Sequence, residues 1–415
     1  MSQELLRIVE NIARDKNIDK ESIFQDLEAA MASATRKHFG NPDIEVAVNI
    51  DRGTGEISVY KDEAQIDIRQ LGRIPAQTAK QVMIQKIRAD ERDSIFADFV
   101  QRKGEIVNGI AGRYESGTLV VTLDNRAEGF MPKTEQISGE VNHPGERIRC
   151  LILNVREASS QVKIILSRTH PDFIKRLFEL EVPEVAEGII EIKSLAREAG
   201  YRTKIAVLSH DDKVDAVGAC VGVRGSRIRS IVDELGGEKI DIVRWSDSSQ
   251  VLISNALMPA KASEIALCFE LGRATVVVSE DQLSLAIGKH GQNVRLAARL
   301  TGWDIDILTP VEYNKEVDSL SSSLKNIEEV DDTFVDKLLA LGIVSVLDLE
   351  EVGTEPLVKE LELDEELARK IVAAASEEAR KMASEKSRKQ AEDIMAQEQQ
   401  EQEVLESDET SEEGQ

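Results

Sequence analysis

The feature of the sequence that most limits its possible folds is a pattern that occurs twice. Residues 221–228 spell VGVRGSRI and residues 286–294 spell AIGKHGQNV, so each stretch holds two glycines three positions apart. The pairs are Gly222 with Gly225 and Gly288 with Gly291. An apolar stripe at helical spacing follows each pair, a short helical pattern precedes it, and strand patterns flank the whole. The sequence therefore predicts one unit, strand–helix–Gly-x-x-Gly–helix–strand, that is built twice.

The physical chemistry of such a turn suits a sugar-phosphate strand. Glycine lacks a Cβ, so another backbone can pass close to it and tight φ/ψ values are accessible. A helix that begins at the turn points free N–H groups and the positive end of its dipole outward. A single Gly-x-x-Gly is usually a plain turn between helices, but two copies with cations in matching contexts favour single-stranded nucleic acid. The predicted RNA-binding residues of the loops are Gly222, Val223, Arg224, Gly225, Arg227, Gly288, Lys289, His290, Gly291, Gln292, Asn293 and Arg295.

The charge of the chain is unevenly distributed. The net charge is −25, which by itself argues against a nucleic-acid partner. Residues 316–415, however, hold 29 acidic and 10 basic side chains, a net charge of −19, and residues 1–315 carry only −6. The acidity belongs to the C-terminal part, and the middle of the chain can still present basic surfaces.

The first 170 residues predict two further units. Residues 1–102 combine helical patterns, over 1–40 and 75–100, with a hairpin signal over 43–61 around an Arg-Gly-Thr-Gly turn. Residues 103–170 show short strands with turn signals about every 10 residues, which is typical of a five-stranded OB-type barrel. Arg113 and Phe130 on this barrel are candidate RNA contacts, a cation and a ring for a single strand. The alternative is that Phe130 belongs to the core and that the barrel cations are ordinary solvated surface.

The C-terminal part has an acidic and helical character. Residues 327–351 place a turn at Gly342 between two amphipathic helices, and a further apolar stripe follows. We expect an acidic helix-hairpin-helix region over 313–384 that binds a protein, because its surroundings lack the cations that DNA binding requires. Residues 385–415 are expected to be disordered, either as a simple solubilising segment or as an interaction tail.

Several functional classes find no support in the sequence. The N-terminus is charged and amphipathic, and no apolar run approaches the roughly 20 residues of a membrane span, so we expect a cytoplasmic protein. The three cysteines are far apart and are expected to be buried apolar residues. No histidine spacing, phosphate-binding loop or nucleophile motif is present. We therefore expect no enzyme activity, no catalytic residues, no metal and no cofactor. The alternatives are RNA-binding factors that act in RNA decay or processing, or in ribosome assembly.

These motifs together resemble a known family. The two repeats are similar to tandem KH domains of the prokaryotic type, over 171–248 and 249–312, and EGFMPKTEQ is similar to a segment of the S-one type RNA-binding barrel. In this order, the parts of this multidomain α+β chain resemble the NusA family of bacterial transcription elongation and termination factors. The resemblance implies that residues 1–102 dock on RNA polymerase near the flap of the β subunit. It also implies that the barrel and both KH domains bind nascent single-stranded RNA, that other Nus-type antitermination factors are partners, and that the protein is a monomer affecting pausing, intrinsic termination and antitermination.

Overall fold

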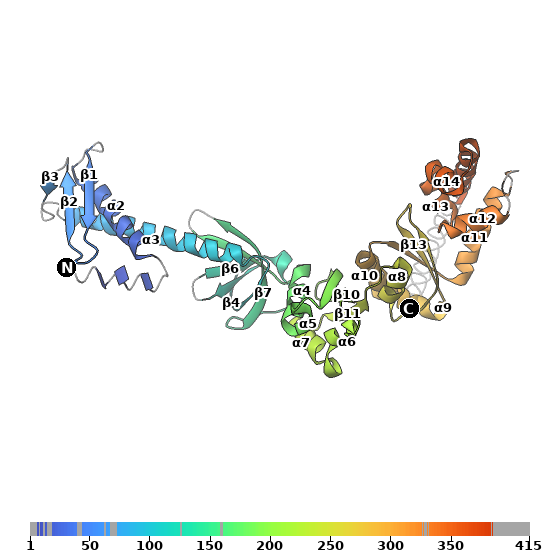
Figure 1. Cartoon of the computed structure of the whole chain (residues 1–415), viewed down its shortest axis with the longest axis horizontal. Helices are drawn as coiled ribbons and strands as arrows, with labels where there is room; N and C mark the ends of the chain where they lie inside the picture. Colours follow the sequence, from blue (N-terminus) through green and yellow to red (C-terminus); the bar gives the residue numbers. More distant parts are fainter. Residues whose placement is uncertain are drawn as a thin grey trace, which may run out of the picture. The chain divides into compact units, whose positions relative to one another are not determined.

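A computed structural model describes residues 6–7, 9–10, 13–14, 19–39, 44–61, 64–66, 73–124, 127–157, 161–325, 327, 330, 332–382 and 384. The chain divides into two compact units, Met1–Leu177 and Phe178–Gln415, and each is described by itself. Figure 1 follows the elements in chain order by colour. The segment predicted to be disordered, 385–415, lies outside the described residues.

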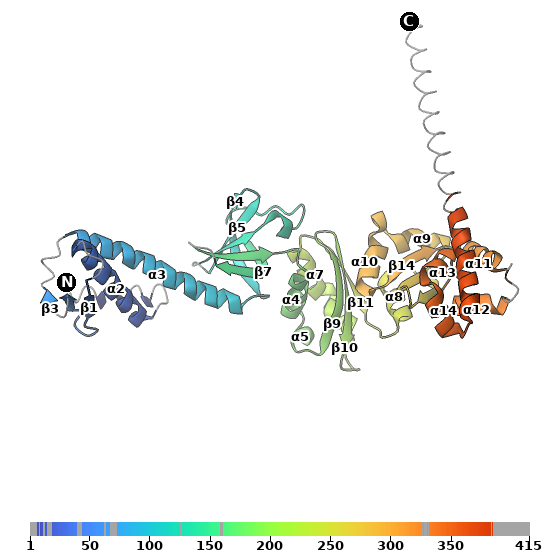
Figure 2. The same cartoon turned by 90° about the horizontal axis from the view of Figure 1, so that it is seen from above.

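The first part of unit 1 is a small sheet with two helices. Helix α2 (Lys20–Phe39) packs against α3 (Arg73–Gln101) and against the sheet β1-β2-β3, as Figures 1 and 2 show. The strands are β1 (Val46–Ile50), β2 (Ile57–Lys61) and β3 (Ala64–Ile66). Strands β1 and β2 pair antiparallel, and the Asp51 carboxylate accepts hydrogen bonds from the amides of Gly53 and Thr54 in the turn between them. The predicted hairpin and the predicted helix after it are confirmed.

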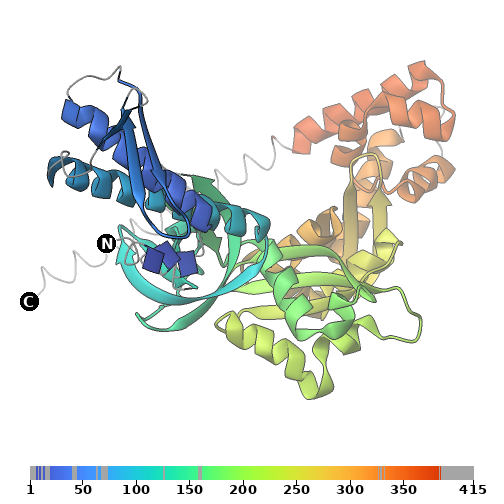
Figure 3. The same ribbon diagram turned by 60° about the vertical axis from the view of Figure 1, so that its left-hand side comes forward.

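The second part of unit 1 is a closed barrel of five strands, whose curved strands Figure 3 shows in cyan to green. The strands are β4 (Ile106–Glu115), β5 (Thr118–Leu123), β6 (Ala127–Met131), β7 (Arg147–Glu157) and β8 (Val162–Ser167). Their order is β4-β5-β6-β8-β7, β4 also pairs with β7, and β6 runs parallel to β8. Aliphatic residues at alternate positions fill the interior, so the scarcity of aromatic residues is no obstacle to a core. The predicted five-stranded barrel is confirmed.

The boundary between the two units falls within α4 (Pro171–Glu181), and unit 2 then contains the same arrangement twice. The first repeat consists of α5 (Pro183–Ala186), β9 (Ile190–Glu198), β10 (Arg202–Ser209), α6 (Ala216–Val221), η3 (Val223–Gly225), α7 (Ser226–Glu234) and β11 (Lys239–Arg244). The second repeat consists of α8 (Ser249–Leu257), β12 (Ala262–Cys268), β13 (Arg273–Val278), α9 (Glu280–Ile287), η4 (Lys289–Gly291), α10 (Gln292–Thr301) and β14 (Asp304–Leu308). In each repeat the first two strands pair antiparallel and the last strand pairs parallel to the second. The duplication predicted from the glycine pairs therefore extends to the whole unit, because both repeats have the same order of helices and the same pairing of strands.

The two repeats share one core. Helix α10 of the second repeat packs on β9 and β10 of the first, and these elements lie together in Figure 2. Ala196, Ala206 and Val243 of the first repeat belong to the same buried cluster as Leu296 and Ala297 of α10. Alanine leaves room for a helix to come close to a sheet, so the small side chains allow this contact.

The C-terminal part of unit 2 is helical. Its helices are α11 (Pro310–Leu324), α12 (Asp332–Ala340), α13 (Val346–Val352), α14 (Thr354–Leu361) and a stretch over 365–382. Gly342 has a φ of 77° in the turn between α12 and α13, which confirms the predicted pair of helices around this glycine. Ser345 and Asp348 form a capping box at the start of α13.

Three further findings concern the cysteines, membrane-spanning helices and metal sites. All three cysteines are free and buried, as predicted, and burial raises the pKa of the Cys220 thiol to about 11. Over the described ranges no helix combines the length and the apolar character that a membrane crossing needs. In the same part of the chain, no three His, Cys, Asp or Glu side chains come together in a way that could hold a metal ion.

Candidate nucleic-acid interface

The two Gly-x-x-Gly loops have the same backbone conformation. Gly222 and Gly288 adopt φ/ψ of 76°/175° and 73°/175°. Arg224 and His290, the last residues between the glycines, are left-handed, at 52°/27° and 54°/30°. The second glycines follow at 76°/21° and 72°/15°, and each is the N-cap of the next helix. Non-glycine residues rarely adopt positive φ, so the same unusual conformation in both copies marks the loops as specialised.

The two glycines of each loop are needed for different reasons. A Cβ on Gly222 would lie 2.8 Å from Cγ of Arg227, and a Cβ on Gly288 would lie 2.8 Å from Cβ of Asn293. The first glycine is therefore packed against the residue five positions later in both copies. A Cβ on Gly291 would meet nothing within 4 Å, so that glycine is needed for its positive φ alone.

The side chains at the tips of the loops face solvent. Val223 is 83% exposed, and Arg224, Lys289 and His290 are also exposed. An exposed valine has no packing role here, while Arg224 and Lys289 supply positive charge and all three basic residues can donate hydrogen bonds. The tips therefore combine an apolar contact and cations with the positive dipole end of a helix that begins at the loop, which together suit a phosphate backbone and its bases.

Two of the predicted RNA contacts have side chains that are engaged beneath the loops. Asn293 is 1% exposed, and its Nδ2 donates to the carbonyls of Leu257 at 3.0 Å, Leu285 at 3.2 Å and Ala286 at 3.1 Å. Arg227 at the equivalent position donates through Nη1 to the Ala219 carbonyl at 2.7 Å and pairs with Glu184 at 2.9 Å. A side chain that is buried under a loop, or engaged below it, holds the backbone in place. Both side chains therefore support the loops, and their contact with RNA stays a prediction.

Two more predicted RNA contacts join the repeats to one another. Gln292 Nε2 donates to Glu198 Oε2 at 2.8 Å, and Arg295 Nε donates to Glu198 Oε1 at 2.7 Å. The Arg295 guanidinium, and after it the Gln292 amide, lowers the pKa of the Glu198 carboxyl below its usual value. Sequence reasoning assigned both side chains to RNA and did not identify Glu198, which lies 97 positions before Arg295.

The two barrel candidates lie on β4 and β6, the strands on either side of β5 in unit 1. Arg113 is 61% exposed at its side chain and pairs with Glu115 at 2.5 Å and with Glu128 at 3.6 Å. Phe130 is half-buried, between the inward-pointing Gly129 and Met131, and its partners on the neighbouring strands are Val120 and Ile165. The Phe130 ring is therefore only partly accessible. This exposure is intermediate between that of a core residue and that of a ring fully open to RNA, the two alternatives predicted from the sequence.

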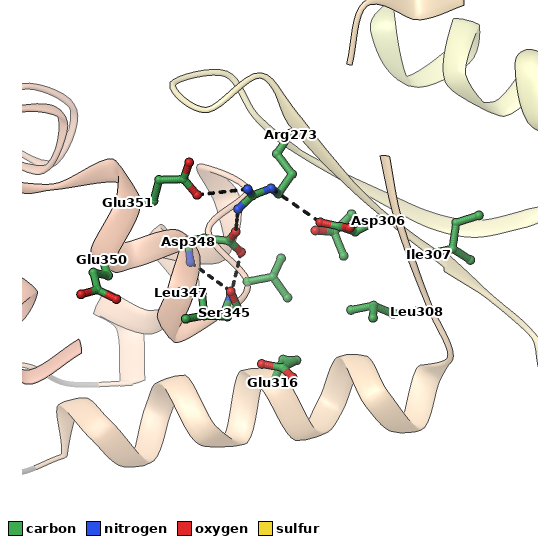
Figure 4. A pocket seen from close by; sticks show the side chains of 12 residues that line it. Arg273, Asp306, Ile307, Leu308, Glu316, Ser345, Leu347, Asp348, Glu350 and Glu351 are labelled. Carbon is green, nitrogen blue, oxygen red and sulfur yellow. Dashed lines mark hydrogen bonds and ion pairs between the residues drawn. The ribbon is translucent and has the colours of Figure 1, made fainter. Parts of the chain in front are cut away.

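The acidic helices contact the second repeat around one arginine, shown in Figure 4. Arg273 at the start of β13 donates to Asp348 at 2.6 Å and to Glu351 at 3.0 Å, and Asp306 lies 3.6 Å away. Burial, and then the charge of Asp304, raises the pKa of Asp306. An open cavity of about 680 Å³ lies at this contact. The acidic region is thus fixed to the second repeat by charged contacts as well as by apolar ones.

Comparisons with known proteins agree with this architecture. Residues 168–245 match the NusA-like first KH domain, residues 249–315 the NusA-like second KH domain, and residues 4–64 and 60–93 the NusA N-terminal domain. The three relatives described below all have the name transcription termination/antitermination protein NusA. That of Bacillus subtilis is 42% identical over 339 residues, which are 74% of this chain and 91% of that protein.

Two further relatives give the same result. The protein of Halalkalibacterium halodurans is 41% identical over 344 residues, 75% of this chain and 90% of its own. That of Rickettsia conorii is 37% identical over 404 residues, 88% of this chain and 80% of its own. The similarity extends over most of both chains and over the N-terminal domain and the two tandem KH domains, so this chain belongs to the NusA family.

Proposed function

We propose that the protein acts on transcribing RNA polymerase, binds the nascent single-stranded RNA through its two Gly-x-x-Gly loops, and thereby modulates pausing, intrinsic termination and antitermination. The observation that carries the proposal is the pair of loops with one backbone conformation and exposed tips. The relatives named above, transcription termination/antitermination proteins, support the transcriptional part.

The parts of the chain have separate roles in this proposal. Residues 1–102 contact RNA polymerase near the flap of the β subunit, and the OB-type barrel over 103–170 adds RNA contacts at Arg113 and Phe130. The KH domains over 171–248 and 249–312 bind RNA by their loop tips. The acidic helix-hairpin-helix region over 313–384 binds a protein, and other Nus-type antitermination factors are partners of the chain. The protein works as a monomer and catalyses no reaction.

The electrostatics of the loops favour RNA despite the acidic chain. Three of the four tip residues are Arg224, Lys289 and His290, and the net charge of residues 1–315 is only −6. Neutralising phosphates releases bound counterions, which makes such binding tight at low salt and weaker as salt rises. The acidity of residues 316–415 opposes RNA binding only where it lies within about 10 Å of the loops, because charges farther apart than that are largely screened at 0.1 M salt.

Reversing the charge of the loop tips tests the proposal. The variant carries Val223→Asp, Arg224→Asp, Lys289→Asp and His290→Asp, which places carboxylates against phosphates. We expect the affinity for single-stranded RNA, measured by fluorescence anisotropy at fixed salt, to fall by at least about 100-fold. Folding should be retained, because the tips are exposed.

A matched control separates the loops from general charge. Lys359→Asp, Arg369→Asp and Lys370→Asp change the net charge by the same six units, at exposed positions of the acidic helices. We expect RNA affinity within about threefold of the wild type for this control. Unchanged affinity in the loop variant would remove the loops from the function. Binding of the wild type to ribosomal subunits but not to RNA polymerase would instead favour ribosome assembly, and degradation of the bound RNA would favour RNA decay.

A further inference from the structure

The helix that begins at the second RNA loop is also the main contact between the two KH domains. Helix α10 starts immediately after Gly291 and packs on β9 and β10 of the first KH domain. Leu296 and Ala297 of α10 are fully buried in the core that includes Ala196 and Ala206 of the first sheet. The second loop is therefore attached directly to the first domain through the helix that forms its base.

A polar contact fixes the first turn of this helix. Glu198, the last residue of β9, accepts a hydrogen bond on each carboxylate oxygen, from Gln292 at 2.8 Å and from Arg295 at 2.7 Å. Its side chain is 21% exposed, so the pair is partly shielded from water. Hydrogen bonds between charged groups are short and directional, so they define an orientation as well as adding energy. The apolar contact sets where α10 lies, and Glu198 sets the orientation of the turn that carries the loop.

The two copies of the loop differ at this point. Arg229 occupies in α7 the position that Arg295 occupies in α10, and each donates to a loop carbonyl, that of Arg224 at 3.4 Å and that of His290 at 3.5 Å. Arg229 is exposed and pairs with no carboxylate among the residues that the structure describes. Arg295 is held by Glu198 of the other domain. The same arginine thus has two different roles in the two copies.

We propose that Glu198 is a positioning residue that couples the two RNA loops, by holding Gln292 and Arg295 so that both loops meet one RNA strand at a fixed spacing. This inference rests on the proposed function and concerns how the RNA is bound. When one RNA strand binds at two sites, the first contact raises the effective concentration of the strand at the second site, and the overall affinity increases. This increase is largest when the spacing of the two sites is fixed. Glu198 therefore matters for a strand that reaches both loops and is unimportant for a strand that reaches only one.

The test compares two lengths of RNA. A strand of about four nucleotides fills one loop, and a strand of about 12 nucleotides is roughly three times that length. In the full chain, Glu198→Ala should weaken binding of the long strand by at least about fivefold and leave the short strand within about twofold. Glu198→Gln, which keeps a hydrogen-bond acceptor for one partner, should restore part of the affinity for the long strand.

A double-mutant cycle identifies the route of the effect. If Glu198 acts through Arg295, the variants Glu198→Ala, Arg295→Ala and the double variant all lose the same affinity for the long strand. A second measurement uses a chain that carries Val223→Asp and Arg224→Asp, which disable the first loop. Binding of the short strand to this chain then measures the second loop alone. In that background Arg295→Ala should leave the short strand unaffected, and a clear loss there would make Arg295 a direct RNA ligand and overturn the inference.

The remaining outcomes distinguish this inference from the proposed function. Equal losses for both strands in Glu198→Ala would indicate a general loss of folding, because removal of a carboxylate alone would favour RNA. No loss for either strand would show that the loops are independent. Either result overturns the coupling and leaves RNA binding by the loops intact. A wild type that binds neither strand would overturn the proposed function and the coupling together.

Discussion

Gly288 lies directly against Asn293, so that a Cβ on the glycine would stand 2.8 Å from the asparagine Cβ and 3.0 Å from its backbone nitrogen. The buried Asn293 amide in turn donates to the carbonyls of Leu257, Leu285 and Ala286. Asn293 therefore supports the second Gly-x-x-Gly loop from beneath. It can lie there only because residue 288 is a glycine and has no Cβ.

This contact predicts a difference between the two glycines of the loop. Gly288→Ala introduces both a strained positive φ and a clash, whereas Gly291→Ala introduces only the positive φ, since nothing lies within 4 Å. A left-handed alanine costs about 1–2 kcal/mol. We expect Gly291→Ala to destabilise the second KH domain by about that amount and Gly288→Ala by more, as measured by hydrogen exchange of α10. Equal effects, or the reverse order, would show that the packing against Asn293 has no energetic weight.

A second glycine contact predicts how the acidic helices are attached. A Cβ on Gly342 would lie 2.2 Å from the Leu267 carbonyl at the end of β12, and Cys268 beside it is part of the core of the acidic helices. We expect Gly342→Ala to separate residues 313–382 from the second KH domain, and limited proteolysis to cut between them. Gly353→Ala is the matched control, because Gly353 also has a positive φ of 75° but has open space around it. Similar cleavage in both variants would rule out the close approach at Gly342 as the cause.

The pKa of Glu198 predicts how the coupling of the KH domains depends on pH. Its folded-state pKa is below the usual value of 4.5, mainly because Arg295 donates to the carboxylate. A carboxyl whose pKa is lowered on folding stabilises the folded state above its unfolded pKa, and this stabilisation is lost as the pH falls through the folded value. The difference in stability between the wild type and Glu198→Gln should therefore be constant above about pH 5 and should shrink below pH 4.5.

Denaturant unfolding at several pH values measures this difference. The comparison of two chains that differ at one carboxyl cancels the titration of the other acidic groups, which matters in a chain of net charge −25. A difference that grows as the pH falls would contradict the charged contact between Glu198 and Arg295.

Local structure was predictable from the sequence where it depends on local chemistry. The loops, the hairpin over 43–61 and the turn at Gly342 all depend on glycine or on alternation within a few residues, and the structure confirms each of them. The five strands of the barrel were likewise visible from short apolar runs and turn signals.

The roles of individual side chains around the loops were not predictable in the same way. Arg227, Gln292, Asn293 and Arg295 carry suitable groups for RNA, but their partners lie in other elements, and one of these is Glu198, 97 positions before Arg295. A sequence pattern gives the offset of a residue in a helix, not what packs against it. The available signal was the glycine at the first loop position of both copies, which the structure shows to be crowded by Arg227 and Asn293.

The central claim is that the protein acts on transcribing polymerase through its contact with RNA. The most direct test is the lifetime of a hairpin-stabilised pause of purified bacterial RNA polymerase, measured with the wild type, with a chain lacking residues 1–102, and with the loop variant that carries four aspartates. We expect the wild type to lengthen the pause, the deletion to abolish the effect, and the loop variant to reduce it. A pause of unchanged lifetime with the wild type, in a preparation that still binds RNA, would contradict the account.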